Sequence, residues 1–233
     1  MKRFYNDVTI VEQAGGWQVM LDGRGIKTVG GAAQLVPGRA LAEALATEWA
    51  SQGGEIDPAS LPLRDQTDFA IDHVVNGPSE TVAKLLGYAE TDTLCYRADP
   101  EDALFLRQQE VWEPLVSAVE EREGIKLYRI SGIIHRAQPQ ASLEQLCEHL
   151  AGLDPFTLAG LFTMTSLAAS LCIGLQALED GSDPAELWRI ANLEEEWQAE
   201  LWGRDEQAED RRARRGDEFA RAHRWICLSR AKQ

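Results

Sequence analysis

Residues 155–178, PFTLAGLFTMTSLAASLCIGLQAL, form an uninterrupted run without a charged side chain. A helix of this length could cross a bilayer. However, Asp154 and Glu179 flank the run with negative charge, whereas the cytoplasmic end of a membrane span usually carries basic residues. A helix that is apolar on all sides is also typical of the centre of a helical domain. We therefore predict a single buried helix, without membrane insertion, as the hydrophobic axis of the fold.

The next segment, residues 182–206, reads SDPAELWRIANLEEEWQAELWGRDE and predicts one amphipathic helix. Ser182 or Asp183 can cap its start, and Pro184 suits the first turn. At about 100° per residue, one face carries an apolar stripe. Its members are Leu187, Ile190, Ala191, Trp197 and Leu201.

Three adjacent glutamates occupy different positions around this helix. Glu194 falls inside the stripe together with Gln198, Glu195 lies at its edge, and Glu196 points away. A carboxylate on an apolar face is costly unless a positive group pairs with it. One explanation is an internal salt bridge to an arginine, for which the cluster Arg211, Arg212, Arg214 and Arg215 is a plausible source. The other is that a partner or substrate supplies the positive group.

The N-terminal part of the chain follows a different pattern. Residues 4–36 alternate between apolar and polar and are broken by glycine pairs, which predicts a small antiparallel β-meander. Residues 37–54 predict a helix in which Leu41, Leu45 and Trp49 recur at helical spacing, so Trp49 is expected to be a structural core residue.

The chain then becomes mostly helical, with an extended stretch at residues 91–97 and a longer helix starting near Asp99. The predicted fold class is α+β. A β-meander plus helix domain (residues 1–70) precedes a larger α-helical domain (residues 71–233) with a buried central helix.

Composition limits the possible functions. The chain has 233 residues, a formal net charge of −15 and a pI near 4.7, which argues against unspecific binding of nucleic acids or anionic membranes. The four cysteines are scattered and lie beside apolar residues, as buried free thiols do. The start of the sequence resembles neither a signal nor a transit peptide, so we expect bacterial cytoplasm, or the mitochondrial matrix for a processed eukaryotic chain.

Conventional catalytic motifs are missing from the sequence. It contains neither a phosphate-binding loop nor a G-x-S-x-G nucleophile elbow, and the four histidines, including His135, are too scattered for a local metal motif. We therefore expect no cofactor and no metal. An alternative is a small-molecule enzyme that uses Glu194 with Glu195 or Glu206 as acid and base. Trp202, beside this acidic helix end, is either a core residue or an interaction hot spot.

Several segments together resemble a known family, the ATP synthase F1-sector assembly chaperones that bind the unassembled alpha subunit. The likeness runs through LDGRGIKT, LAEALATEW, TDTLCYR, WEPLV and LEEEWQAELWG, in this order along nearly the whole chain. Gly25 and Val29 depart from it, because prolines are expected there. The resemblance implies a non-catalytic, two-domain chaperone that needs no ATP, and it maps the family's important glutamate onto Glu194.

The resemblance also implies a mechanism in which the chaperone shields an aggregation-prone surface of the free alpha subunit until the beta subunit displaces it. The residues expected to contact this partner are Glu194, Glu195, Gln198, Trp202 and Glu206. We expect the chaperone itself to be a monomer that does not enter the membrane.

Overall fold

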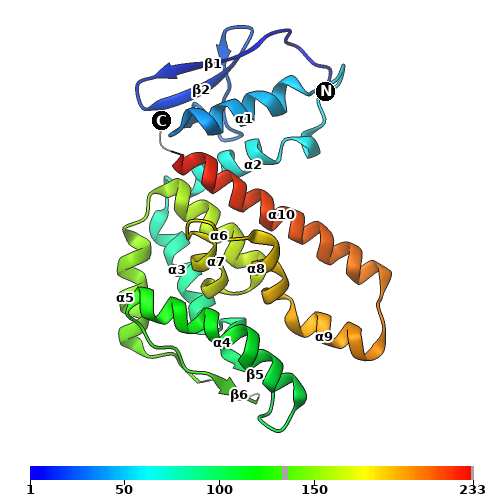
Figure 1. Ribbon diagram of the computed structural model, residues 1–233. Helices are drawn as coiled ribbons and strands as arrows, with labels where there is room; N and C mark the ends of the chain where they lie inside the picture. The colour runs from blue at the N-terminus through cyan, green and yellow to red at the C-terminus, as the bar shows by residue number, and fades with distance from the viewer. Residues whose placement is uncertain (133–135, 232–233) are drawn as a thin grey trace. The chain divides into compact units, whose positions relative to one another are not determined.

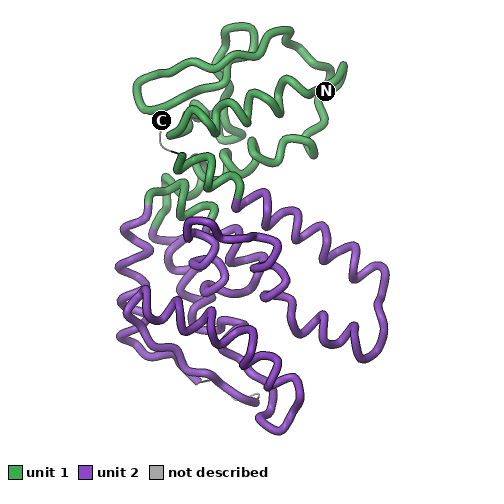
Figure 2. Tube along the Cα trace, viewed as in Figure 1, with its two compact units in different colours: residues 1–78, 154–160, 224–233 green, residues 79–153, 161–223 purple. Residues whose placement is uncertain are grey.

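The computed structural model describes residues 1–132 and 136–231, so His135 lies outside the described residues. The described chain divides into two compact units (Figure 2). Unit 1 consists of residues 1–78, 154–160 and 224–233, and unit 2 of residues 79–153 and 161–223. Each unit therefore collects segments that are distant in sequence, while the division into domains at residue 70 stays a prediction.

The sheet of unit 1 confirms the predicted antiparallel meander (Figure 1). Its strands are β1 (Val8–Gln13), β2 (Gly16–Leu21), β3 (Arg24–Gly25) and β4 (Leu35–Val36). β2 is central and pairs with the other three, all antiparallel. Asp22 and Gly23 both have positive φ, which is the geometry of a tight hairpin turn between β2 and β3.

Helices cover this sheet within unit 1. α1 (Arg39–Ala50) packs on β1 and β2 and buries Leu41 and Leu45 completely. The chain continues through a 3₁₀ turn, α2 and a π-helical turn, at Pro58–Ser60, Pro62–Phe69 and Ala70–Val74 respectively. Glu48 of α1 caps α2 by accepting hydrogen bonds from the backbone N–H groups of Leu63 and Arg64.

Gly25, one of the two departures from the family pattern, has a defined packing role. A Cβ at this position would lie 2.5 Å from the side-chain oxygen of Gln18. Gln18 is buried and donates a hydrogen bond to the carbonyl of Ile26 at 2.7 Å. The missing side chain at position 25 therefore makes room for a buried glutamine that ties β2 to β3.

Unit 2 is mostly helical and contains a short parallel strand pair. Its elements in chain order are α3 (Pro78–Glu90), a 3₁₀ turn (Thr93–Cys95), β5 (Tyr96–Arg97), α4 (Ala103–Glu123), β6 (Ile130–Ser131), α5 (Gln140–Ala151), α6 (Pro155–Ala168), α7 (Leu171–Ala177), α8 (Pro184–Ala191), α9 (Leu193–Trp202) and α10 (Glu206–Arg230). α6 and α10 each contribute residues to both units. The stretch predicted to be extended is thus a 3₁₀ turn followed by a two-residue strand that pairs with β6.

The prediction of a single helix over residues 155–178 is wrong, because the run divides into α6 and α7. Ala169 adopts a left-handed conformation with φ 50°, and Ser170 caps α7 by accepting a hydrogen bond from the N–H of Ile173. The fully buried carboxylate of Asp92 accepts hydrogen bonds from the Ser170 hydroxyl and the Cys172 N–H. A distant acidic residue therefore stabilises the break.

Most residues of the central run are buried, as predicted, and the others are half-buried apart from Ala169, which is exposed at the turn. Leu161, Met164 and Ile173 are fully buried. Among the described residues, no helix is long and apolar enough to cross a membrane. The small antiparallel sheet region and the larger helical part confirm the predicted α+β class.

The cysteines only partly match the prediction of buried thiols. Cys95 and Cys172 are buried and Cys147 is half-buried, but Cys227 is exposed. Trp225 and Ile226 occupy the buried face of α10, so the residue that follows them turns toward solvent.

Candidate functional site

Residues 182–206, predicted to be one helix, form α8, α9 and the start of α10. Asp183 caps α8 as expected, by accepting a hydrogen bond from the N–H of Ala185. Asn192 then leaves the helical conformation, with φ −102° and ψ 22°, and its side chain donates to the carbonyl of Trp188 at 2.7 Å. A second break follows at Gly203, where φ is 94°. The prediction of one continuous helix is therefore wrong.

The break at Asn192 changes which residues are buried. Leu187 and Leu193 are buried, whereas Leu201, predicted to lie in the same apolar stripe, is 57% exposed. Leu193 falls outside the predicted stripe because that stripe assumes a helical phase without interruption.

Glu194 is half-buried and faces α4 within unit 2. Its Oε1 accepts a hydrogen bond of 2.6 Å from the amide nitrogen of Gln108. Gln108 is completely buried, and its side-chain oxygen accepts a hydrogen bond from the N–H of Ala98. Both ends of this amide are therefore occupied, and it holds the Glu194 carboxylate in one orientation.

Gln108 belongs to a larger buried polar network between α4, β5 and the segment around β6. The carbonyl of Gln108 accepts a hydrogen bond from Arg97, whose guanidinium pairs with Glu113 at 3.1 Å. Arg129 pairs with Glu113 at 2.7 Å and with Glu120 at 2.6 Å. These charges compensate one another, so the network leaves no cation for Glu194.

The proposed internal salt bridge of Glu194 is absent from the described residues. In the arginine cluster of α10, Arg212 pairs with Glu209 at 2.6 Å, and Arg215 donates to the carbonyl of Leu167 at 2.7 Å. Arg212 thus pairs within its own helix, and Arg215 contacts α6. A neutral amide has taken the place of the expected arginine, because Gln108 lies on the facing side of α4.

The environment of Glu194 disfavours its negative charge. Burial raises the pKa of this carboxyl above its ordinary value, and the neighbouring charge of Glu195 raises it further. The hydrogen bond from Gln108 lowers the pKa but does not outweigh the burial. An incoming positive group would therefore find a carboxylate that gains from being paired.

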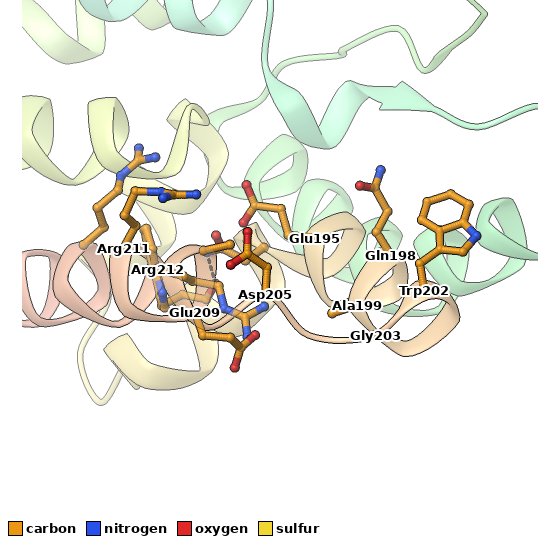
Figure 3. Close-up of a pocket in the computed structure, with 13 residues that line it drawn as sticks. Glu195, Gln198, Ala199, Trp202, Gly203, Asp205, Glu209, Arg211 and Arg212 are labelled. Carbon is orange, nitrogen blue, oxygen red and sulfur yellow. Dashed lines mark hydrogen bonds and ion pairs between the residues drawn. The ribbon is translucent and has the colours of Figure 1, made fainter.

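A groove of about 420 Å³ lies between α9 and α10, and Glu195, the neighbour of Glu194, lines it. We call it the α9–α10 groove. α9 contributes Glu195, Gln198, Ala199 and Trp202, and the first half of α10 forms the other wall with Arg211, Arg212 and Arg215. Glu195, Gln198 and Trp202 project from one side of α9 (Figure 3), as their spacing of three and four residues requires.

Trp202 makes this groove unusual for a protein surface. Its side chain is 78% exposed at the end of α9, and neighbouring Leu201 is exposed as well. A large indole that remains in water gains free energy when a partner covers it. The exposure excludes the core alternative for Trp202, and its role as an interaction hot spot stays a prediction.

The charges of the groove are separated between its two walls. Glu195 on α9 is exposed and has no ion-pair partner within residues 1–132 and 136–231. On the α10 side, Glu209 bridges Arg204 and Arg212. Thus the α9 wall has unpaired negative charge. The opposite wall carries Asp205 and Glu209 and three arginines, of which Arg211 and Arg215 form no ion pair among the described residues.

The structure brings together some of the predicted site residues and separates others. Glu195, Gln198 and Trp202 line the α9–α10 groove, whereas Glu206 is exposed at the start of α10 and is not part of the lining. Glu194 does not line the groove either. At helical spacing it lies between the side of α9 that faces the groove and the side that packs on α4.

This placement gives no support to the enzyme alternative. Glu194 is directed toward Gln108 while Glu195 lines the groove, so the two carboxylates do not face a common cavity. The described residues also contain no group of three or more metal-ligating side chains.

Gln108 is the site residue that sequence reasoning missed. It occupies the same face of α4 as Trp112, Leu115 and Val119, all of which are buried. A glutamine in an apolar helical stripe is the same signal that singled out Glu194. Trp112 adds a second tie, because its indole N–H donates to the carbonyl of Ile190 at 2.8 Å and holds the end of α8.

Comparison with known proteins agrees with this architecture. The model of the family described as ATP12 chaperone protein matches residues 2–120. The crystal structure of Atp12 from Paracoccus denitrificans is 36% identical in sequence, covers 98% of each chain and superposes with a TM-score of 0.93. The mitochondrial proteins atp12 of Schizosaccharomyces pombe and ATP12 of Saccharomyces cerevisiae are 26% and 28% identical. Each matches 90% of this chain, over 76% and 78% of its own length. The chain therefore belongs to the ATP12 chaperone family and is a molecular chaperone.

Proposed function

We propose that this chaperone assists assembly of the F1 sector of ATP synthase by binding the unassembled alpha subunit through α9 and the α9–α10 groove. The observation that carries the proposal is the 78% exposure of Trp202 on the side of α9 that also presents Glu195 and Gln198. Such an arrangement is costly for a protein that works alone and suits one that waits for a partner.

Shielding is the mechanism that follows. A free alpha subunit exposes the surface that the beta subunit later covers, and exposed assembly surfaces aggregate. Trp202 and Leu201 would cover an apolar part of that surface, while Glu195 would meet a basic group at its margin. Because charged residues surround the apolar part of the contact, that part stays small. The beta subunit can therefore displace the chaperone.

Glu194 would supply the strongest polar contact. The hydrogen bond from Gln108 to Oε1 fixes the orientation of the carboxylate and therefore also the position of Oε2. Neither oxygen has an ion-pair partner in the described part of the chain. An arginine or lysine of the client at this oxygen would pair with a partly desolvated carboxylate, where charge-assisted hydrogen bonds are strongest. Glu206, at the start of α10, would extend the acidic margin.

Matched charge reversals on α9 test the proposal. Glu195→Lys and Glu200→Lys change the net charge equally and affect exposed residues of one helix, but only Glu195 lines the groove. We expect Glu195→Lys to reduce co-purification of the alpha subunit and Glu200→Lys to retain it, with both melting like the parent.

Trp202→Ala measures the apolar part of the same contact. Removal of an indole hot spot costs about 2 kcal/mol or more, so capture of the alpha subunit should fall by at least about tenfold. Thermal stability should stay the same because the side chain is exposed. Undiminished capture by Trp202→Ala together with Glu195→Lys would exclude this surface as the client site.

The cellular location is part of the same proposal. Both yeast relatives are named mitochondrial proteins. We propose that this chain acts in the bacterial cytoplasm, or in the mitochondrial matrix if it derives from a processed eukaryotic precursor.

A further inference from the structure

Unit 1 contains a groove of its own, which the proposed client contact on unit 2 does not use. It encloses about 500 Å³ and is lined by Phe4, Tyr5, Leu21, Asp22, Arg24, Gly25, Ile26, Lys27 and Trp49. We call it the β3 groove, because β3 and the residues after it form one wall. All of its lining residues belong to unit 1.

Aromatic rings form the apolar part of the β3 groove. The ring centroids of Phe4 and Tyr5 lie 5.3 Å apart, and those of Tyr5 and Trp49 lie 5.9 Å apart, both edge to face. Tyr5 is buried and donates its hydroxyl hydrogen bond to the backbone carbonyl of Trp49 at 2.6 Å, whereas Phe4 is 63% exposed. The floor is thus held in place, while the outermost ring is available to a partner.

Trp49 adds an unused hydrogen-bond donor to this wall. Its indole N–H is enclosed and has no acceptor in the described structure. A buried donor without a partner is unfavourable, because it has lost its hydrogen bond to water. The indole therefore loses no hydrogen bond if it tilts toward an occupant that carries an oxygen acceptor.

The charges at the rim of the groove oppose the charge of the chain as a whole. Arg24 and Lys27 are exposed, and neither forms an ion pair within the described residues. The single acidic lining residue, Asp22, accepts hydrogen bonds from the N–H groups of Asn6 and Asp7 at 3.0 and 2.8 Å, which stabilise its negative charge beside Arg24. With two basic side chains and one carboxylate, the lining keeps one net positive charge. A locally positive groove on a protein with a net charge of −15 favours a negatively charged occupant.

From these observations, we infer that the β3 groove binds an acidic peptide segment of a partner protein, in which an apolar side chain stands next to a carboxylate. The apolar side chain packs against Phe4 and Trp49, and the carboxylate pairs with Lys27 or Arg24. This contact is chemically opposite to the one proposed for α9, which presents carboxylates to a basic partner. The two sites therefore do not compete for the same segment of a partner.

A titration with short peptides tests the inference on the full-length protein. The probe is an acetylated, amidated hexapeptide of sequence Gly-Leu-Asp-Phe-Asp-Gly, and its control replaces both aspartates with asparagine. The readout is the indole N–H resonance of Trp49, assigned by its loss in Trp49→Phe. We expect a saturable shift with the acidic peptide and at least tenfold weaker binding of the asparagine peptide.

Paired charge reversals distinguish a local site from overall attraction. Lys27→Glu with Arg24→Glu should weaken binding of the acidic peptide at least tenfold. Lys84→Glu with Arg107→Glu changes the net charge equally at exposed positions of unit 2 and should leave binding intact. Equal losses in the two double variants, equal binding of the two peptides, or no saturable shift would each overturn the inference. Glu195→Lys, which tests the client contact, should still bind the peptide, so the two proposals can fail separately.

Discussion

At the scale of single residues, Gln108 decides how the charge of Glu194 is presented. A buried amide donates to the carboxylate without neutralising it, and the surrounding charged pairs are already complete. Glu194 is therefore oriented by the fold but has no counter-ion among the described residues. This makes its titration a direct measure of whether the carboxylate is a structural or a partner-binding group.

Glu194→Gln should leave the protein at least as stable as the parent at neutral pH. Burial raises the pKa of Glu194 in the folded state above the ordinary value of 4.5. The charged form is thus disfavoured by folding, and stability is lost as the pH rises from the unfolded pKa through the folded pKa. The glutamine variant does not titrate, so its melting temperature relative to the parent should be higher at pH 7 than at pH 4.

Thermal melts of the two proteins at both pH values check this expectation. Glu196→Gln, on another side of α9, is the control and should show no such difference. If Glu194 were instead held by an internal ion pair, the substitution would cost about 3–5 kcal/mol at neutral pH. If Glu194→Gln lost this much stability and still captured the alpha subunit at low temperature, the result would show that Glu194 has a structural role.

Trp49→Arg should unfold or precipitate the protein. Trp49, predicted to be a core residue, is only half-buried. It packs edge to face on buried Tyr5, and its indole nitrogen is enclosed, so an arginine would leave a void and place a charge against aromatic rings. The expected cost is about 3–5 kcal/mol. Urea unfolding of soluble material measures it, with Trp49→Phe as the milder comparison. A Trp49→Arg protein that melts like the parent would show that the residue does not stabilise unit 1.

At the scale of elements, the close approach of α6 and α7 depends on a glycine. A Cβ at Gly174 would lie 2.2 Å from the side-chain oxygen of Thr165 and 2.9 Å from Leu161. Both neighbours are fully buried and cannot move aside easily. The turn at Ala169 and Ser170 therefore returns α7 onto α6 at a distance that only glycine permits.

Gly174→Ala should destabilise unit 2 by about 1–3 kcal/mol, because an added methyl group overpacks this contact. The matched control is Gly87→Ala in α3, where a Cβ would meet no atom within 4 Å. In that open position, alanine should stabilise the helix by about 0.5–1 kcal/mol. Chemical denaturation of the two variants should thus give shifts of opposite sign, and two shifts of the same sign would contradict the packing explanation.

At the scale of the whole molecule, we predict that the free chaperone is a monomer. A net charge of −15 makes copies of the chain repel one another, which opposes self-association through the exposed Trp202. Sedimentation equilibrium at physiological salt should give a mass near 25.9 kDa. If the parent had twice this mass and Trp202→Ala had the mass of one chain, the α9–α10 groove would instead bind a second copy.

The sequence by itself determined the types of the elements and most of their order. Alternation and glycine pairs predict the meander of residues 4–36, helical spacing predicts α1, and the resemblance of several ordered segments implies the chaperone family. These signals are local or depend on order along the chain, so they do not require knowledge of what packs against what. Glu194 stands out in the same way, because helical spacing alone places this carboxylate in an apolar stripe, where an unpaired charge is costly.

Only the tertiary structure decided the partner of that carboxylate and the exposure around it. Residues 155–178 form two helices because buried Asp92, from another part of the chain, stabilises the turn at Ser170. Glu194 meets Gln108 and not an arginine because the break at Asn192 and the packing of α9 on α4 set its direction. Leu201 and Trp202 are exposed at the end of α9, although helical spacing places Leu201 in the apolar stripe. Each outcome depends on contacts between residues far apart in sequence, which periodicity along one segment does not contain.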